Sequence, residues 1–130
     1  MSEVTPEQVL STMEPDPAWD AASYEEAVET LGREGLTFRV WGGDWCPDCR
    51  QQLPQFAAAL DAAGVPDERI HAAAVEREDG EKVGPGLEEY GIDLIPTVVV
   101  EDTDGAEIAR FVESEAKPIA LFLADEIASA

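Results

Sequence analysis

The sequence predicts an α/β sandwich in which helices cover both faces of a central mixed β-sheet. Stretches with helical and with strand-like patterns alternate along the 130 residues, which is typical of a sheet buried between helices. A predicted hairpin near the C-terminus adds an antiparallel pair of strands. The length suits one domain, so we expect a single domain over residues 1–130. Its core should span about residues 20–130, with residues 1–19 as an N-terminal extension or short helix.

The first predicted helix and strand lie between residues 20 and 41. Apolar residues recur there at helical spacing: Tyr24, Ala27, Val28 and Leu31. Ser23 and Glu26 form a capping box that would begin this helix, and Gly32 or Gly35 would end it. Residues 36–41 are rich in β-forming side chains and predict a strand.

A longer helix is predicted from about Cys46 to Ala63, and Pro54 inside it should cause a kink. The elements after it are a weak strand, a short helix, the two hairpin strands and a last helix. These lie at residues 70–76, 87–90, 97–101, 107–112 and 118–128 respectively.

The composition argues against several classes of binding partner and against a membrane-spanning segment. The chain has 29 acidic and 8 basic residues, a net charge of −21, and this charge argues against nucleic acid or an anionic membrane as a partner. No apolar run reaches the ~20 residues that a membrane helix needs. The start, Met1–Glu7, has no signal-peptide pattern. We therefore expect a cytoplasmic protein.

The acidic residues are spread along the whole chain, which indicates an acidic surface rather than an acidic tail. Such a surface repels itself at low ionic strength, but at molar salt the Debye length falls to about 3 Å and screens most of the repulsion. This pattern predicts a protein from a salt-loving organism. An ordinary acidic protein of a mesophile is the alternative.

Both cysteines lie in one motif, Trp45-Cys46-Pro47-Asp48-Cys49, where the strand passes into the long helix. Two cysteines three residues apart on the first turn of a helix share a face and can close a small disulfide ring. The unpaired N–H groups and positive dipole end of the helix favour a thiolate on the first cysteine. Cys46 is therefore the predicted nucleophile, and Cys49 would resolve the mixed disulfide. Pro47 presets the helical φ.

Asp48 and two other interpretations of the motif bear on this prediction. The charge of Asp48 opposes ionisation of the neighbouring thiols, which favours a reductant, although a solvated aspartate that helps to start the helix is the alternative. A Cys-x-x-Cys is also half of a zinc site, but a structural site needs four ligands, and only His71 and carboxylates remain. We therefore predict no metal. Chance spacing of two unrelated cysteines is the other alternative.

The chain resembles the thioredoxin family, over about residues 35–130. The features that match are Trp41 four residues before the motif, Pro54 five after the second cysteine, a segment at residues 90–97, and the hairpin with its terminal helix. The resemblance implies a thioredoxin-like three-layer sandwich. It also implies a cis peptide at Ile95–Pro96, packed against the disulfide.

The same resemblance implies a substrate groove. The Ile95 backbone would pair with an extended substrate segment, and Trp45 and Thr97 would flank the groove beside Pro96. An ordinary trans proline before an edge strand and a packing role for Trp45 are the alternatives.

Three positions depart from the family pattern. Val40 replaces a buried acid, Ala74 aligns with a lysine near that acid, and Glu113 aligns with a glycine that lines the groove. The usual proton relay is therefore missing, and Asp48 or a water would have to replace it.

From the motif and the resemblance we expect a thiol–disulfide oxidoreductase that acts chiefly as a cytosolic reductase of protein or small-molecule disulfides. It would need no bound cofactor, because a thioredoxin-reductase-like enzyme or a low-molecular-weight thiol would supply electrons. We expect a monomer. The alternatives are a non-catalytic binding or scaffold module with this fold, and a disulfide oxidase or isomerase; the last pair belongs to oxidising compartments.

Overall fold

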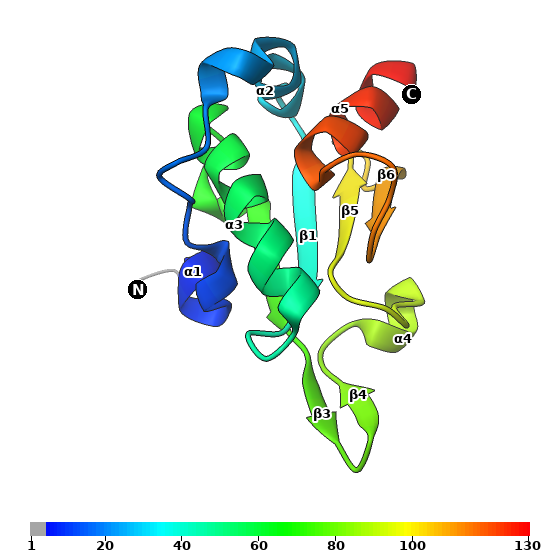
Figure 1. The fold of residues 1–130 in the computed structure, drawn as a ribbon. Helices are drawn as coiled ribbons and strands as arrows, with labels where there is room; N and C mark the ends of the chain where they lie inside the picture. The colour runs from blue at the N-terminus through cyan, green and yellow to red at the C-terminus, as the bar shows by residue number, and fades with distance from the viewer. Residues whose placement is uncertain (1–4) are drawn as a thin grey trace.

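The computed structural model describes residues 5–130 (Figure 1). Residues 1–4, on which part of the expected extension and our interpretation of the chain's start rest, lie outside the described residues. None of the described helices is both long and apolar enough to cross a membrane.

The central sheet has four strands in the order β2-β1-β5-β6. These strands are β1 Thr37–Gly42, β2 Ile70–Ala74, β5 Thr97–Glu101 and β6 Glu107–Val112. β1 pairs with β2 in parallel, whereas β1–β5 and β5–β6 are antiparallel. The predicted mixed sheet and its closing hairpin are confirmed.

One face of the sheet carries the apolar core and the longer helices. These helices are α2 Glu25–Leu31, α3 Pro47–Ala62 and α5 Ile119–Ser129. Successive residues of a strand point to opposite faces, and Phe38 and Val40 of β1 point to this one. Phe38 meets Phe56 of α3 edge-on at 6.2 Å between ring centroids, and Phe111 meets Phe122 of α5 at 5.6 Å. This packing fixes α3 across the sheet (Figure 1).

The opposite face is covered by the one-turn helix α4, Leu87–Tyr90, and the loop before it. The indole Nε1 of Trp41 donates to the carbonyl of Pro85 at 2.8 Å, and the Trp41 ring lies 5.0 Å from that of Tyr90. Arg39, on the same face, forms an ion pair of 2.7 Å with Glu101. Helices therefore cover both faces, as predicted, but the second layer is thin.

The N-terminal segment departs in part from expectation. The short helix is split into α1, Pro6–Val9, and a 3₁₀ turn at Ser11–Met13. The predicted capping box of Ser23 and Glu26 is wrong, because a 3₁₀ turn precedes α2 and Asp20 caps that turn. The Ser23 hydroxyl donates to Asp20 at 2.7 Å instead.

The strand predicted at residues 70–76 is also wrong at its end. β2 stops at Ala74, and the next residues form a separate two-stranded sheet of β3, Glu76–Glu78, and β4, Glu81–Val83. Asp79 and Gly80 connect them with φ angles of 50° and 83°, the left-handed conformations of a two-residue hairpin turn. This hairpin projects from the lower end of the molecule in Figure 1.

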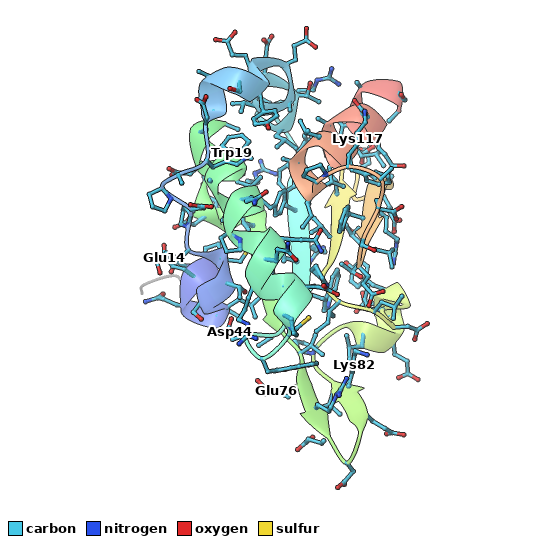
Figure 2. The ribbon with its side chains drawn as sticks, viewed as in Figure 1. Glu14, Trp19, Asp44, Glu76, Lys82 and Lys117 are labelled. Carbon is cyan, nitrogen blue, oxygen red and sulfur yellow. The ribbon has the colours of Figure 1, made fainter. Side chains whose placement is uncertain are left out.

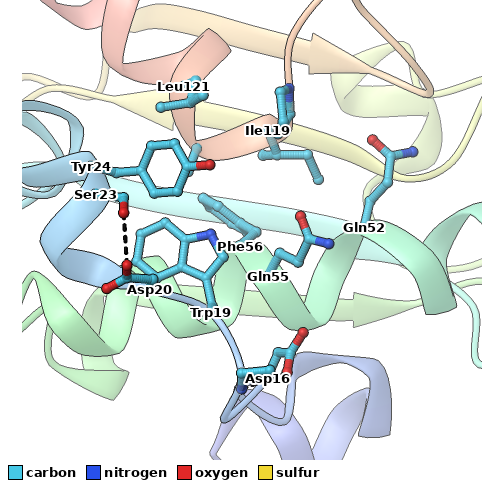
Figure 3. A pocket seen from close by; sticks show the side chains of 13 residues that line it. Asp16, Trp19, Asp20, Ser23, Tyr24, Gln52, Gln55, Phe56, Ile119 and Leu121 are labelled. Carbon is cyan, nitrogen blue, oxygen red and sulfur yellow. Dashed lines mark hydrogen bonds between the residues drawn. The ribbon is translucent and has the colours of Figure 1, made fainter.

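A cavity of about 340 Å³ lies between the segment before α2 and the helices α3 and α5 (Figure 3). Trp19 and Tyr24 stack on one wall, with ring centroids 5.3 Å apart, and Phe56 and Ile119 lie on the facing side. Neither cysteine lines this cavity. The cavity is therefore separate from the thiols.

Candidate active site

The two cysteines lie at the start of α3. Cys46 is the residue that caps the helix, with extended φ and ψ, and Pro47 and Asp48 follow in the first turn. This places Cys46 beside the unpaired N–H groups of the helix end and Cys49 on the same turn. Both are free thiols and both are buried, Cys46 with 6% and Cys49 with 0% of its surface exposed.

The environment of Cys49 keeps it protonated. The pKa of Cys49 is raised to about 12, chiefly by burial; the Gly43 N–H lowers it, and the neighbouring Cys46 and the charge of Asp48 add smaller contributions that raise it. That N–H donates to the Cys49 sulfur at 3.5 Å. Cys49 therefore needs a proton acceptor before it can attack a disulfide.

The loop before β5 contacts the first thiol. Ile95 and Pro96 precede β5, are both buried, and are joined by a cis peptide bond. The Cys46 sulfur lies 4.0 Å from the Ile95 carbonyl oxygen, within range of a thiol hydrogen bond. Thus α3 and the start of β5 bring together residues that lie 49 positions apart.

The expected groove residues Trp45 and Thr97 differ in exposure. Trp45 has 36% of its surface exposed and lies beside Cys46, whereas Thr97 is 1% exposed. The Thr97 hydroxyl donates to the carbonyl of Leu94 at 2.6 Å. The Thr97 side chain therefore stabilises the conformation of the loop that contains Leu94 and Ile95.

Leu94 belongs to the surface around the thiols and was missed in the sequence. The large hydrophobic side chains exposed among the described residues are Tyr24, Trp45 and Leu94. Trp45 adjoins Cys46, and Leu94 adjoins Ile95 in the facing loop. The sequence signal was an apolar residue just before the Ile-Pro pair, but apolar pattern alone does not tell an exposed leucine from a core one.

Trp45 joins the thiol loop to the β3–β4 hairpin. Its indole Nε1 donates to the carbonyl of Val75 at 2.8 Å, and the Arg77 guanidinium lies 5.0 Å from its ring centroid. Gly43 permits this approach, since a Cβ there would lie 2.6 Å from the Trp45 Nε1. The hairpin is therefore anchored beside Cys46, and its Asp79-Gly80 pair was the sequence signal that could have revealed it.

Asp44, which the sequence analysis also did not single out, ties the thiol loop to the N-terminal segment. Its carboxylate accepts hydrogen bonds of 3.1 Å from the N–H groups of Ser11 and Thr12. Partial burial opposes ionisation, but these N–H groups outweigh it and lower the pKa of Asp44 below its usual 3.8. Figure 2 shows Asp44 at the end of the molecule where α3 begins.

The structure places the three residues that depart from the family pattern, Val40, Ala74 and Glu113. Val40 is 0% exposed and packs in the apolar core. Ala74 ends β2 and pairs with Gly42. Glu113 has a φ of 51° and bonds through its main chain to Pro96 and Gln52. Neither Val40 nor Ala74 can accept a proton from Cys49.

Within residues 5–130, no group of three or more histidine, cysteine, aspartate or glutamate side chains is placed to hold a metal ion.

A family model described as thioredoxin matches residues 19–125. The match extends over most of the chain, so the chain belongs to the thioredoxin family. This confirms the resemblance seen in the sequence and the fold class predicted from it.

The chain is also similar in sequence to one part of a much longer protein. It is 35% identical over 69 residues to protein disulfide-isomerase A5 of Bos taurus, which is 48% of this chain and 13% of that protein. The chain thus spans about one eighth of the length of this relative.

The chain is also similar to two solved structures. StoA from Bacillus subtilis matches with a TM-score of 0.47 and 21% identity, over 72% of this chain and 83% of that one. A disulphide isomerase from Xylella fastidiosa matches with a TM-score of 0.43 and 22% identity, over 88% and 93% of the chains.

Proposed function

We propose that this protein is a thiol–disulfide oxidoreductase that reduces disulfides through Cys46 and Cys49. The observation that carries the proposal is the placement of two free, adjacent thiols at the start of α3, with the Cys46 sulfur 4.0 Å from the Ile95 carbonyl. Membership of the thioredoxin family and the likeness to a protein disulfide-isomerase support it.

The reaction has two exchange steps. The Cys46 thiolate attacks one sulfur of a substrate disulfide, forms a mixed disulfide, and releases the first substrate thiolate. Cys49 then loses its proton, attacks the Cys46 sulfur, and releases the second thiolate as the Cys46–Cys49 disulfide forms. The substrate gains two electrons, and an external thiol or a reductase returns two electrons to the pair.

The departing substrate thiolate is the acceptor that we propose for the proton of Cys49. With Val40 and Ala74 at the positions of the usual relay, the side chain chemically suited to help is Asp48, directly or through a water. The Gly43 N–H, 3.5 Å from the Cys49 sulfur, would stabilise the new thiolate. The first released thiolate is then neutralised as Cys49 becomes nucleophilic, and the second takes its proton from water.

The substrate segment would lie along the Ile95–Pro96 loop. No hydrogen bond among residues 5–130 uses the Ile95 N–H, so the main chain there can pair with an extended peptide. Trp45 and Leu94, both partly exposed, would contact the apolar side chains of that segment. Pro96 and Thr97 would shape the loop. A monomer is sufficient for this function.

The reducing direction and a cytoplasmic location belong to the same proposal. Asp48 supports the direction, because its charge raises the pKa of Cys49 and so disfavours a thiolate in the reduced pair, which works against a strongly oxidising pair. Isomerisation of protein disulfides is the second candidate function. The relative that is 35% identical over 69 residues, a protein disulfide-isomerase, favours it.

Two measurements test the proposal. Wild-type protein should reduce a fluorogenic peptide disulfide, Cys46→Ser should not, and Cys49→Ser should accumulate the mixed disulfide. The Cys46–Cys49 disulfide should form at a midpoint near −270 mV, whereas a midpoint near −120 mV would indicate an oxidant. Undiminished activity of Cys46→Ser would contradict the proposal and favour a binding module.

A further inference from the structure

The β3–β4 hairpin is held at both of its ends, by the thiol loop on one side and by β1 on the other. The Trp45 Nε1 donates to the carbonyl of Val75, just before β3, and the Trp41 Nε1 donates to the carbonyl of Pro85, just after β4. Gly84 lets the two ends meet, since a Cβ there would lie 3.0 Å from the Ala74 carbonyl oxygen. The hairpin is therefore held in a defined position next to Cys46.

The two faces of this hairpin carry opposite charge. Residues paired directly across antiparallel strands point to the same face. Arg77 pairs with Lys82, whereas Glu78 pairs with Glu81 and Glu76 with Val83 on the other face. Because the Arg77 guanidinium lies over the Trp45 ring, the Arg77–Lys82 face is the one turned toward the thiol loop.

Stability does not explain this pair of cations. Like charges directly opposite each other on a sheet are destabilising, and the chain has 29 acidic residues to set against 8 basic ones. Arg39, Arg110 and Lys117 each form an ion pair, but within residues 5–130 neither Arg77 nor Lys82 does. The other described cations without an ion pair are Arg33, Arg50 and Arg69. Arg77 and Lys82 differ from them in being paired across one face of the hairpin that Trp45 holds, and two neighbouring cations of this kind fit an anionic ligand.

We propose that Arg77 and Lys82 bind an acidic segment next to the disulfide of a protein substrate, and so select acidic substrates for the thiols. The inference rests on the proposed function. The hairpin extends past the start of α3 (Figure 1), so its cations meet a substrate that continues beyond the disulfide. Lys82 lies at the same end of the molecule as Asp44 of the thiol loop (Figure 2).

The test compares two peptide disulfides that differ only in three glutamates or three glutamines beside one half-cystine. kcat/KM is measured at the lowest salt that keeps a native circular-dichroism spectrum. The wild type should prefer the glutamate peptide by about three- to tenfold, since an exposed ion pair contributes up to about fivefold. Arg77→Gln/Lys82→Gln should bring the ratio close to one.

Two further variants separate charge recognition from other effects. Arg33→Gln/Arg69→Gln makes the same change in net charge at the opposite end of the parallel strands β1 and β2, and it should keep the wild-type ratio. Lys82→Gln leaves Arg77 on Trp45, so a partial fall in its ratio excludes altered Trp45 packing as the cause. An unchanged ratio in the Arg77/Lys82 double variant, or an equal fall in the Arg33/Arg69 control, would overturn the inference.

Other outcomes are equally decisive. If the wild type reduces both peptides at one rate, the inference fails while the oxidoreductase stands; if it reduces neither, the proposed function fails. 3,3′-Dithiodipropionate and its neutral diamide, compared in the same way, test a small anionic disulfide. A preference for dithiodipropionate as large as that for the glutamate peptide would overturn the assignment to a protein segment.

Discussion

The main-chain N–H of Glu113 donates a hydrogen bond of 2.7 Å to the carbonyl oxygen of Pro96. Glu113 makes this bond from the left-handed region, with a φ of 51°, and its own carbonyl accepts from the Gln52 side chain at 2.8 Å. The end of β6 is thereby tied to both α3 and the loop over the thiols. A glycine, which the family resemblance places here, would adopt this conformation without a Cβ penalty.

Glu113→Gly should therefore stabilise the protein. The left-handed conformation costs a residue with a Cβ about 1 kcal/mol, and part of that gain is offset by the greater freedom of glycine in the unfolded chain. We expect a net gain of about 0.5 kcal/mol in the free energy of unfolding, measured by urea titration. Glu113→Ala, which removes the carboxylate but keeps the Cβ, should show no such gain, and an equal gain would refute the backbone explanation.

Cys49 should be nearly unreactive in the folded protein. In Cys46→Ser, the burial that raises the pKa of Cys49 to about 12 in the native chain persists, so iodoacetamide should modify Cys49 far more slowly at pH 8 than it modifies a free thiol. In denaturant the same cysteine should react at the ordinary rate. A folded Cys46→Ser variant whose labelling rate titrates with a midpoint near 9.0 would show that burial does not control this thiol.

The same thiol should make stability fall at alkaline pH. The pKa of Cys49 is about 12 when folded, against 9.0 for a free thiol, so its contribution is complete below pH 9 and is lost as pH rises toward 12. The free energy of unfolding should decline over this interval, and less steeply in Cys49→Ala. Identical slopes for the wild type and Cys49→Ala would contradict this, with Cys46→Ala as the matched cysteine control.

Asp44 should stabilise the docking of the N-terminal segment. Asp44→Ala removes the acceptor for the Ser11 and Thr12 N–H groups and should cost about 1 kcal/mol. Because the pKa of Asp44 is lowered, its contribution is present above pH 3.8 and should be lost as pH falls below that value. Asp93→Asn, an exposed change of equal charge in another loop, should have little effect. Hydrogen exchange at residues 5–13 would report the loss, and unaltered exchange in Asp44→Ala would disprove the tether.

Salt should stabilise the whole molecule. Raising NaCl from 0.1 M to 1 M shortens the Debye length from about 10 Å to about 3 Å, which screens repulsion among the charges that sum to −21. The melting temperature should rise over this range and continue to rise with KCl at higher concentration, as the proposed salt-loving source requires. A melting temperature that is highest at low salt would eliminate that proposal.

The pattern of the sequence was sufficient for most elements of the fold. The strands at residues 97–101 and 107–112 and the short helix at 87–90 have the predicted bounds, because each has a local signal in its apolar spacing or in a flanking glycine. The hairpin β3–β4 was missed, since its three-residue strands are charged at every position except Val83 and have no apolar alternation. Only Asp79-Gly80 marked it.

For the candidate site, too, the features with a local sequence pattern were predicted and those that depend on long-range contacts were not. A Cys-x-x-Cys at a strand–helix junction is a local pattern, so it was enough to predict two thiols at the start of a helix. The contact of the Ile95 carbonyl with Cys46, the bonds from Asp44 to the N-terminal segment and the position of Arg77 over Trp45 became visible only in the folded chain. These contacts join residues 32 or more positions apart. Such contacts depend on how whole layers pack, which is the sum of many weak interactions that no local spacing records.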